Sequence, residues 1–261
     1  MKDKRRILYI IIIFLIIVAS IVLISLGIIW NKKTEKPTIT TPSVKEIVKE
    51  KEQINYQEEE KTKVEETPYN NLLPEYRNQY GNPYIMGRLE IPNLNIDTFV
   101  TRYINNEYYL DYNIYNQKDG IGVPFFDFRN TDLQNSRQIN IYGHNTTNPN
   151  IRGQLPFTNL EAFLDQNIFN NYKDAYLSTD DGIMKYKLVA TKIITESNNE
   201  HMKLIFLTDN NYHLHLEKLL NDTMYLDTST SITEKDAILV LQVCNYNPPN
   251  TFLLVIYKKV S

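Results

Sequence analysis

Short stretches of alternating apolar and polar residues fill most of the chain from residue 84 onward, and turn-forming residues separate them. A period of two is typical of strands with one buried face, and short apolar runs bounded by Gly, Pro or Asn are typical of fully buried strands. These patterns predict strands at residues 84–91, 95–101, 122–127, 138–145, 175–178, 184–195, 203–207, 237–244 and 251–257.

Apolar residues at helical spacing predict helices at residues 67–81, 160–169 and 210–221, with a short helix or loop at 108–110. Gly81 is the expected stop of the first helix. Many short strands with a few inserted helices predict a mainly β fold. We expect a mixed barrel or sandwich and not a doubly wound parallel sheet.

The N-terminal segment has a different pattern, because residues 7–30 are almost entirely apolar. At about 1.5 Å per residue this segment would span about 36 Å, which exceeds a hydrocarbon core of about 30 Å. It is longer than the apolar region of a cleavable signal peptide, and Ile28, Ile29 and Trp30 offer no cleavage site of small residues. We therefore expect an uncleaved transmembrane signal anchor.

Basic residues before this segment set its expected orientation, since positive charge favours the cytoplasmic side. They are Lys2, Lys4, Arg5 and Arg6. The predicted organisation is a cytoplasmic N-terminus at 1–6, an anchor at 7–30, a linker at 31–66 and an extracytoplasmic domain at 67–261. The linker is rich first in Thr and Pro and then in Lys and Glu, as solvated linkers are, although a faint apolar stripe leaves a short coiled coil open.

The composition of the chain limits which functions are compatible with the sequence. The net charge is −3 and no basic patch dominates, which argues against nucleic-acid binding. The chain has a single cysteine, so no internal disulfide can form. A lone cysteine in an exported protein is a candidate reactive thiol, although many free cysteines are small buried apolar residues.

Cys244 and His144 both stand at the predicted ends of strands, where functional residues are often held by a rigid scaffold. An imidazole is suited to move the proton of a thiol nucleophile. His213 and His215 are two residues apart on a predicted helix and face different sides, and His201 falls in a polar loop. The histidines and the cysteine lack the spacing of metal ligands, so we expect neither metal nor cofactor.

Several segments, taken in order, resemble the sortase family and its class B in particular. They are Met86-Gly87-Arg88-Leu89-Glu90-Ile91-Pro92-Asn93, Tyr108-Tyr109-Leu110, Phe126-Asp127-Phe128-Arg129-Asn130, Ile141-Tyr142-Gly143-His144-Asn145, Met224-Tyr225-Leu226-Asp227-Thr228 and the strand ending at Cys244. The resemblance covers about residues 67–261. It implies an eight-stranded sortase-like β-barrel with an additional N-terminal helix and a long helix before the cysteine strand.

The resemblance also implies a reaction. Cys244 would attack a threonine carbonyl in the C-terminal sorting signal of a surface protein and form a thioester. An amine of a cell-wall peptidoglycan precursor would then resolve this intermediate, with His144 moving the protons. The expected location is the cell membrane, crossed once, with the catalytic domain outside. No cofactor is implied.

This sequence departs from the family at two positions. The family's arginine, at the start of the strand after the cysteine loop, is replaced by Thr251, and no arginine occurs after Arg152. Val243 stands where a threonine usually precedes the cysteine. A lost donor of this kind costs on the order of 10²–10³ in rate. The neutral side chains that could donate instead are those of Thr251, Asn250, Asn245 and Tyr246.

Two functions of different classes therefore stay open. The first is an unusual but active class B-like sortase, which the presence of both Cys244 and His144 favours. The second is a sortase-fold binding or assembly module with impaired catalysis, which the missing arginine favours. A pilus-polymerising sortase is disfavoured, because no second apolar span follows the predicted barrel.

Overall fold

The computed structural model describes residues 71–206 and 208–261. The predicted cytoplasmic N-terminus, transmembrane anchor and linker lie outside the described residues. Within the described part of the chain, no helix is both long enough and apolar enough to cross a membrane.

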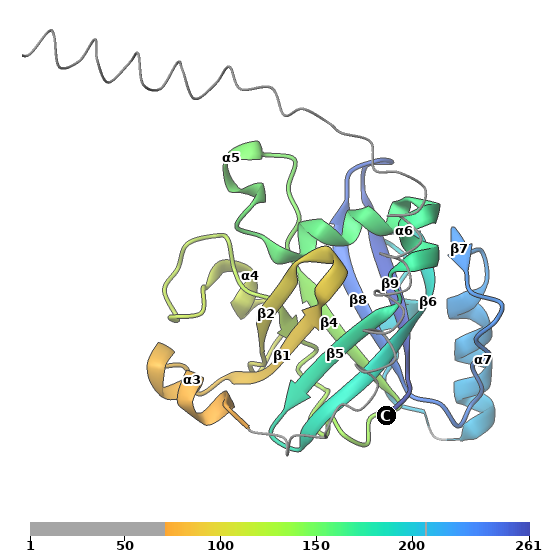
Figure 1. The fold of residues 1–261 in the computed structure, drawn as a ribbon, viewed down its shortest axis with the longest axis horizontal. Coiled ribbons are helices and arrows are strands. Elements are labelled where there is room, and N and C mark those ends of the chain that lie inside the picture. Colours follow the sequence, from red (N-terminus) through yellow and green to blue (C-terminus); the bar gives the residue numbers. More distant parts are fainter. Residues whose placement is uncertain (1–70, 207) are drawn as a thin grey trace, which may run out of the picture. The chain divides into compact units, whose positions relative to one another are not determined.

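The strands of the described residues form one sheet that closes on itself (Figure 1). Its neighbours run in the order β5-β1-β2-β3-β4-β8-β9-β6, and β6 pairs back onto β5. Eight strands thus close the barrel, while β7 pairs only with β6. The bounds are β1 Ile85–Ile91, β2 Ile96–Thr101, β3 Phe125–Phe126, β4 Gln138–Gly143, β5 Asp174–Thr179, β6 Gly182–Thr195, β7 Tyr225–Leu226, β8 Ile238–Asn245 and β9 Thr251–Lys259.

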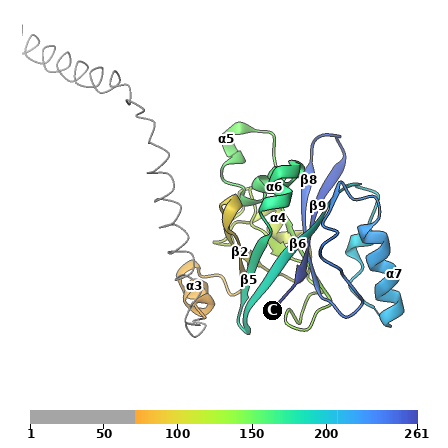
Figure 2. The same ribbon diagram turned by 45° about the vertical axis from the view of Figure 1, so that its right-hand side comes forward.

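Helices surround this barrel, and α3 and α7 lie on opposite sides of it in both ribbon views (Figures 1 and 2). The α-helices are α3 Leu73–Tyr80, α4 Tyr108–Asp111, α5 Pro149–Arg152, α6 Gln166–Asn171 and α7 Asp209–Leu220. The 3₁₀ helices are η1 Pro92–Leu94, η2 Pro156–Leu164 and η3 Glu200–Met202. As expected, α3 stops at Gly81, whose φ of 60° is the left-handed conformation of a helix C-cap.

Alternation along the strands divides the apolar residues between two cores. In β8, Leu239, Leu241 and Val243 point into the barrel and join its main apolar cluster. Ile238 and Val240 point outward and pack in a second cluster with residues of α7. Side chains on successive strand residues point to opposite faces, so a run that is apolar at every position is buried on both sides. This explains why the cysteine strand reads as a continuous apolar run.

Several sequence predictions were wrong in detail. Lys203–Phe206 is irregular although its pattern alternates, and Phe206 instead packs its ring against Tyr212 with centroids 4.7 Å apart. Of the strand predicted at 122–127, only the two residues of β3 form a strand. The helix predicted at 160–169 is split, because Asp165 leaves the helical conformation and caps α6 with its carboxylate. The short elements β7 and α5 were not predicted.

Candidate active site

His144 and Cys244 are brought together by two neighbouring parallel strands. The last residue pair of β4 and β8 joins Gly143 to Val243, so His144 and Cys244 are the next residues on the two chains. Val243 points into the barrel, which directs Cys244 to the outer face. Both His144 and Cys244 are half-buried. The two residues selected from the sequence therefore stand side by side at one end of the barrel.

The surroundings of the Cys244 thiol favour its protonated form. Partial burial raises its pKa above the ordinary value, and the negative charge of Glu196 raises it further. Only the thiolate is a strong nucleophile. Attack by Cys244 therefore needs a neighbouring base to accept the proton.

His144 is held by the short helix α4. Its Nε2 lies 2.7 Å from the carbonyl oxygen of Leu110. A carbonyl can only accept a hydrogen bond, so Nε2 carries a proton in this arrangement and Nδ1 of the neutral ring is the free acceptor. Helix α4 thus sets both the orientation and the tautomer of the imidazole.

Gly122 allows the close packing around His144. Its φ is +69°, and a Cβ placed there would lie 2.4 Å from the carbonyl oxygen of Tyr109 and 3.1 Å from Cδ2 of His144. Both the backbone conformation and the lack of space require glycine. The loop that carries Gly122 therefore forms one wall of the imidazole site.

Asn145 links the segments that follow His144 and Cys244. Its side-chain Nδ2 donates to the carbonyl oxygen of Cys244 at 2.9 Å, and the Tyr246 hydroxyl donates to the carbonyl oxygen of Asn145 at 2.8 Å. Asn145 also contacts Glu161, which pairs with Arg152. These reciprocal contacts fix the ends of β4 and β8 relative to each other.

The turn between β8 and β9 contains the neutral side chains considered as replacements for the arginine. Thr251 donates to the carbonyl oxygen of Pro248 at 2.6 Å and accepts from Nδ2 of Asn245 at 2.9 Å. Both side chains are buried within the turn. Asn250 is exposed, and its φ is +57°. The turn therefore uses the polar groups of Thr251 and Asn245 internally and leaves the Asn250 side chain at the surface.

A buried polar network lies on the outer face of β4, below His144. Its members are linked by hydrogen bonds of 2.7–3.2 Å, which run from Nε2 of His215 through Gln138, Asn140 and Tyr142 to the Asp127 carboxylate. His201 contributes its carbonyl oxygen and is buried, although the sequence placed it in a polar loop. The alternation of polar residues along β4 was the signal for this network.

Asp127 ends the network as a buried carboxylate. Burial alone would raise its pKa, but hydrogen bonds from Arg129, Tyr142 and Asn106 outweigh it and lower the pKa. Arg129 makes contacts of 2.8 and 2.6 Å to the two carboxylate oxygens. Arg129 therefore has a structural role as the ion-pair partner of this buried carboxylate. Among the residues that the structure describes, no three His, Cys, Asp or Glu side chains cluster as metal ligands.

Known proteins resemble this chain in fold and in part of its sequence. No protein-family model matches the chain. Sortase B of Listeria monocytogenes is 25% identical over 165 residues, which are 63% of this chain and 64% of that protein. The match thus covers less than two thirds of the curated relative.

Solved structures give the fold. Sortase B of Clostridium perfringens matches with a TM-score of 0.66 and 23% identity, over 72% of this chain and all of that one. A sortase B–substrate complex from Staphylococcus aureus matches with a TM-score of 0.64 and 20% identity, over 81% of this chain and 94% of that one. The chain has the class B sortase fold. The resemblance inferred from the sequence motifs is confirmed, and so is the eight-stranded barrel that it implied.

Proposed function

We propose that this chain is a cysteine transpeptidase of the class B sortase type. The observation that carries the proposal is the parallel register of β4 and β8, in which His144 and Cys244 directly follow the paired residues Gly143 and Val243. A nucleophile and its base are thereby supplied by rigid strand ends and not by mobile loops.

The proposed reaction begins with the protonated thiol. Nδ1 of His144 accepts the proton of Cys244 while Sγ bonds to the carbonyl carbon of a threonine in the sorting signal. The amide C–N bond then breaks, and the leaving amine takes the proton from His144. An amine of a peptidoglycan precursor attacks the thioester, gives up a proton to His144, and releases Cys244 as a thiol.

The oxyanion formed in each step needs a donor. Of the neutral side chains considered from the sequence, Asn250 and Tyr246 are exposed, but the Tyr246 hydroxyl already donates to the carbonyl oxygen of Asn145. Thr251 and Asn245 are engaged with each other. We assign the role to the side-chain amide of Asn250. A neutral amide is a weaker donor than a guanidinium, so turnover should be slow for this class of enzyme.

The proposed partners are surface proteins that carry a C-terminal sorting signal and a peptidoglycan precursor that supplies the amine. The S. aureus protein of the same fold has been solved as a substrate complex, which supports a peptide site on this barrel. We place the protein in the cell membrane, on the strength of the apolar segment at 7–30. The catalytic domain would then meet both substrates at the outer membrane face.

A second candidate function is a binding or assembly module with little catalysis. Three features favour it, namely the missing arginine, the raised pKa of Cys244, and Phe252 in the position opposite the thiol. Such a protein would bind a sorting peptide without cleaving it.

Product analysis distinguishes the two. The purified chain would be incubated with a panel of sorting-signal peptides, with and without triglycine as the amine, and the products separated by chromatography. The transpeptidase predicts a peptide–triglycine product that disappears in His144→Ala. Peptide binding by calorimetry without any product would favour the binding module.

A further inference from the structure

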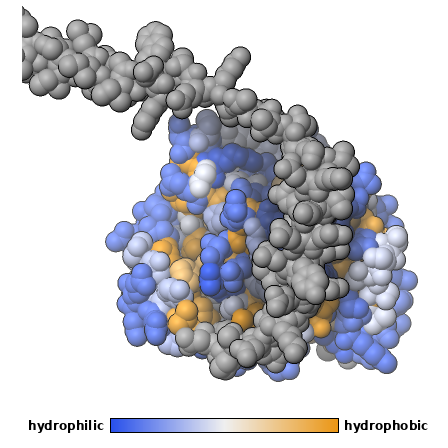
Figure 3. Space-filling model, viewed as in Figure 1, coloured by the Kyte–Doolittle hydropathy of each residue, from blue (hydrophilic) through white to orange (hydrophobic). Residues whose placement is uncertain are grey.

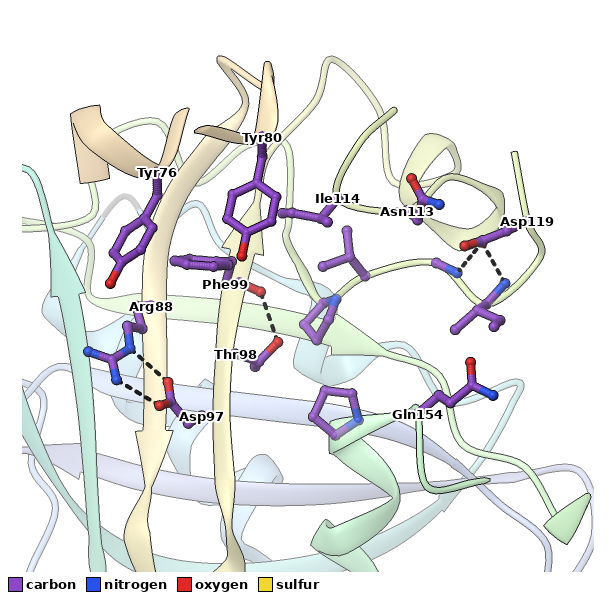
Figure 4. A pocket seen from close by; sticks show the side chains of 15 residues that line it. Tyr76, Tyr80, Arg88, Asp97, Thr98, Phe99, Asn113, Ile114, Asp119 and Gln154 are labelled. Atoms are coloured by element: carbon purple, nitrogen blue, oxygen red, sulfur yellow. Dashed lines mark hydrogen bonds and ion pairs between the residues drawn. The ribbon is translucent and has the colours of Figure 1, made fainter. Parts of the chain in front are cut away.

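A cavity of about 510 Å³ lies between α3, β2 and the loop that leads to β3 (Figure 4). This loop carries Gly122 and forms one wall of the His144 imidazole site. The size of the cavity falls within the roughly 300–1,000 Å³ of typical small-molecule pockets. The cavity lies next to His144, but neither His144 nor Cys244 lines it. No step of the proposed reaction involves this cavity.

One side of the cavity is aromatic. Tyr76 and Tyr80 descend from α3 onto Phe99 of β2, with ring centroids 4.7 and 5.4 Å from the Phe99 ring (Figure 4). The three rings are half-buried, so each keeps part of its surface accessible. Aromatic faces carry negative charge density, which attracts the weakly positive C–H groups of an apolar ring face.

The other side is polar. Asn113, Asp119 and Gln154 face the aromatic side across the cavity (Figure 4). Asn113 uses Oδ1 to hold the backbone of Tyr115 and Gln117, which leaves its Nδ2 donor for a ligand. Asp119 likewise uses Oδ1 for the backbone N–H groups of Ile121 and Gly122. The second carboxylate oxygen is then available as an acceptor.

The charge of the lining limits the ligand class. Arg88 is bound through two hydrogen bonds of 2.7 Å by Asp97, which cancels its charge. Among the described residues of the lining, Asp119 is then the one charged group without an ion-pair partner. A negative lining disfavours phosphates and carboxylates, while neutral donors and acceptors opposite aromatic rings suit a polyhydroxy ring with an apolar face.

We propose that this cavity binds a neutral saccharide of the N-acetyl amino sugar type. The aromatic side formed by Tyr76, Tyr80 and Phe99 packs against the apolar face of the sugar, and Asn113, Asp119 and Gln154 bind its hydroxyl and amide groups. A single residue, Gly122, lies in both the cavity lining and the His144 wall. The sugar portion of the incoming amine substrate would thereby be held next to the base. This last assignment rests on the proposed function, whereas sugar binding does not.

The test is a titration of the full chain with a β-1,4-linked N-acetylglucosamine disaccharide, followed by ligand-observed NMR. Saturable binding is expected. Phe99→Leu keeps an apolar side chain but removes the aromatic face, and it should weaken binding about fivefold or more. Gln154→Ala alters only an exposed side chain and should also weaken binding, so the test does not depend on one variant folding. Gln79→Ala, on the same helix but outside the cavity, should bind as the parent does.

Three results would overturn the proposal: no saturable binding, binding unaffected by both cavity variants, or displacement of the sugar by a sorting-signal peptide. The Cys244→Ala chain should still bind the disaccharide. Sugar binding without any acyl transfer would support the cavity and refute the proposed function, whereas acyl transfer without sugar binding would do the reverse.

Discussion

Cys244 lies directly across from Phe252 in the antiparallel pair of β8 and β9, and the next pair joins Asn245 to Thr251. Directly paired residues of an antiparallel sheet point to the same face. Phe252, not Thr251, therefore shares the outer face with the thiol. The simple sequence alignment placed Thr251 at the position of the sortase arginine, but the side chain of Thr251 turns into the β8–β9 turn.

Phe252→Arg should therefore increase turnover. The new guanidinium would project beside Cys244, where a charged donor can be worth up to about 10²–10³ in rate. Thr251→Arg should instead destabilise the chain by about 1–3 kcal/mol, because it breaks the buried contacts with Asn245 and Pro248. Both variants would be compared by kcat/KM and thermal unfolding. Activation by Thr251→Arg but not by Phe252→Arg would refute this placement.

Two glycines of one loop allow a controlled comparison. Gly120 and Gly122 share a φ of +69°, but an added Cβ has free space at Gly120 and meets Tyr109 and His144 at Gly122. Gly120→Ala should cost only the backbone strain of about 1 kcal/mol. Gly122→Ala should add a clash and reduce kcat by displacing His144.

Kinetics of both variants alongside their unfolding temperatures check this prediction. Equal effects of the two substitutions on activity would show that Gly122 does not position the imidazole.

The negative charge of Glu196 should lower the reactivity of the Cys244 thiol. Because this charge raises the pKa of Cys244, Glu196→Gln should lower that pKa and increase the thiolate fraction at neutral pH. Interactions with an exposed charge are small, so we expect alkylation by iodoacetamide to speed up by about 1.5- to 5-fold. Glu217→Gln on α7 is the control and should leave the rate unchanged. A slower reaction in Glu196→Gln would contradict the assignment.

Stability should fall in mild acid because of two buried histidines. Burial lowers the pKa of His201 and His215 below the ordinary value, even though Glu200 lies 3.3 Å from Nδ1 of His215. As pH falls below about 6.5 the unfolded chain takes up protons that the folded chain resists, so the free energy of unfolding decreases.

Urea unfolding between pH 7.5 and 5 measures this effect. His215→Gln should reduce the slope with pH, and His213→Gln, at an exposed position, should not. A free energy of unfolding that stays constant or rises toward pH 5 would refute the prediction.

The features that depend on local sequence pattern could be predicted from the sequence. The features that depend on tertiary contacts could not. The alternation located most strands, and the single Cys244 with His144 at strand ends located the candidate site. The register between β8 and β9 could not be predicted from the sequence, because it depends on the length and internal hydrogen bonds of the turn. The burial of His201 was likewise missed, since its neighbours in space, such as Gln242, are distant in sequence.

The most direct test of the central claim is the intact mass of the chain after mixing with sorting-signal peptides. The account predicts an acyl adduct on Cys244, which hydroxylamine removes and which the Cys244→Ala chain never forms. Absence of an adduct with every peptide, or an equal adduct on the Cys244→Ala chain, would contradict it.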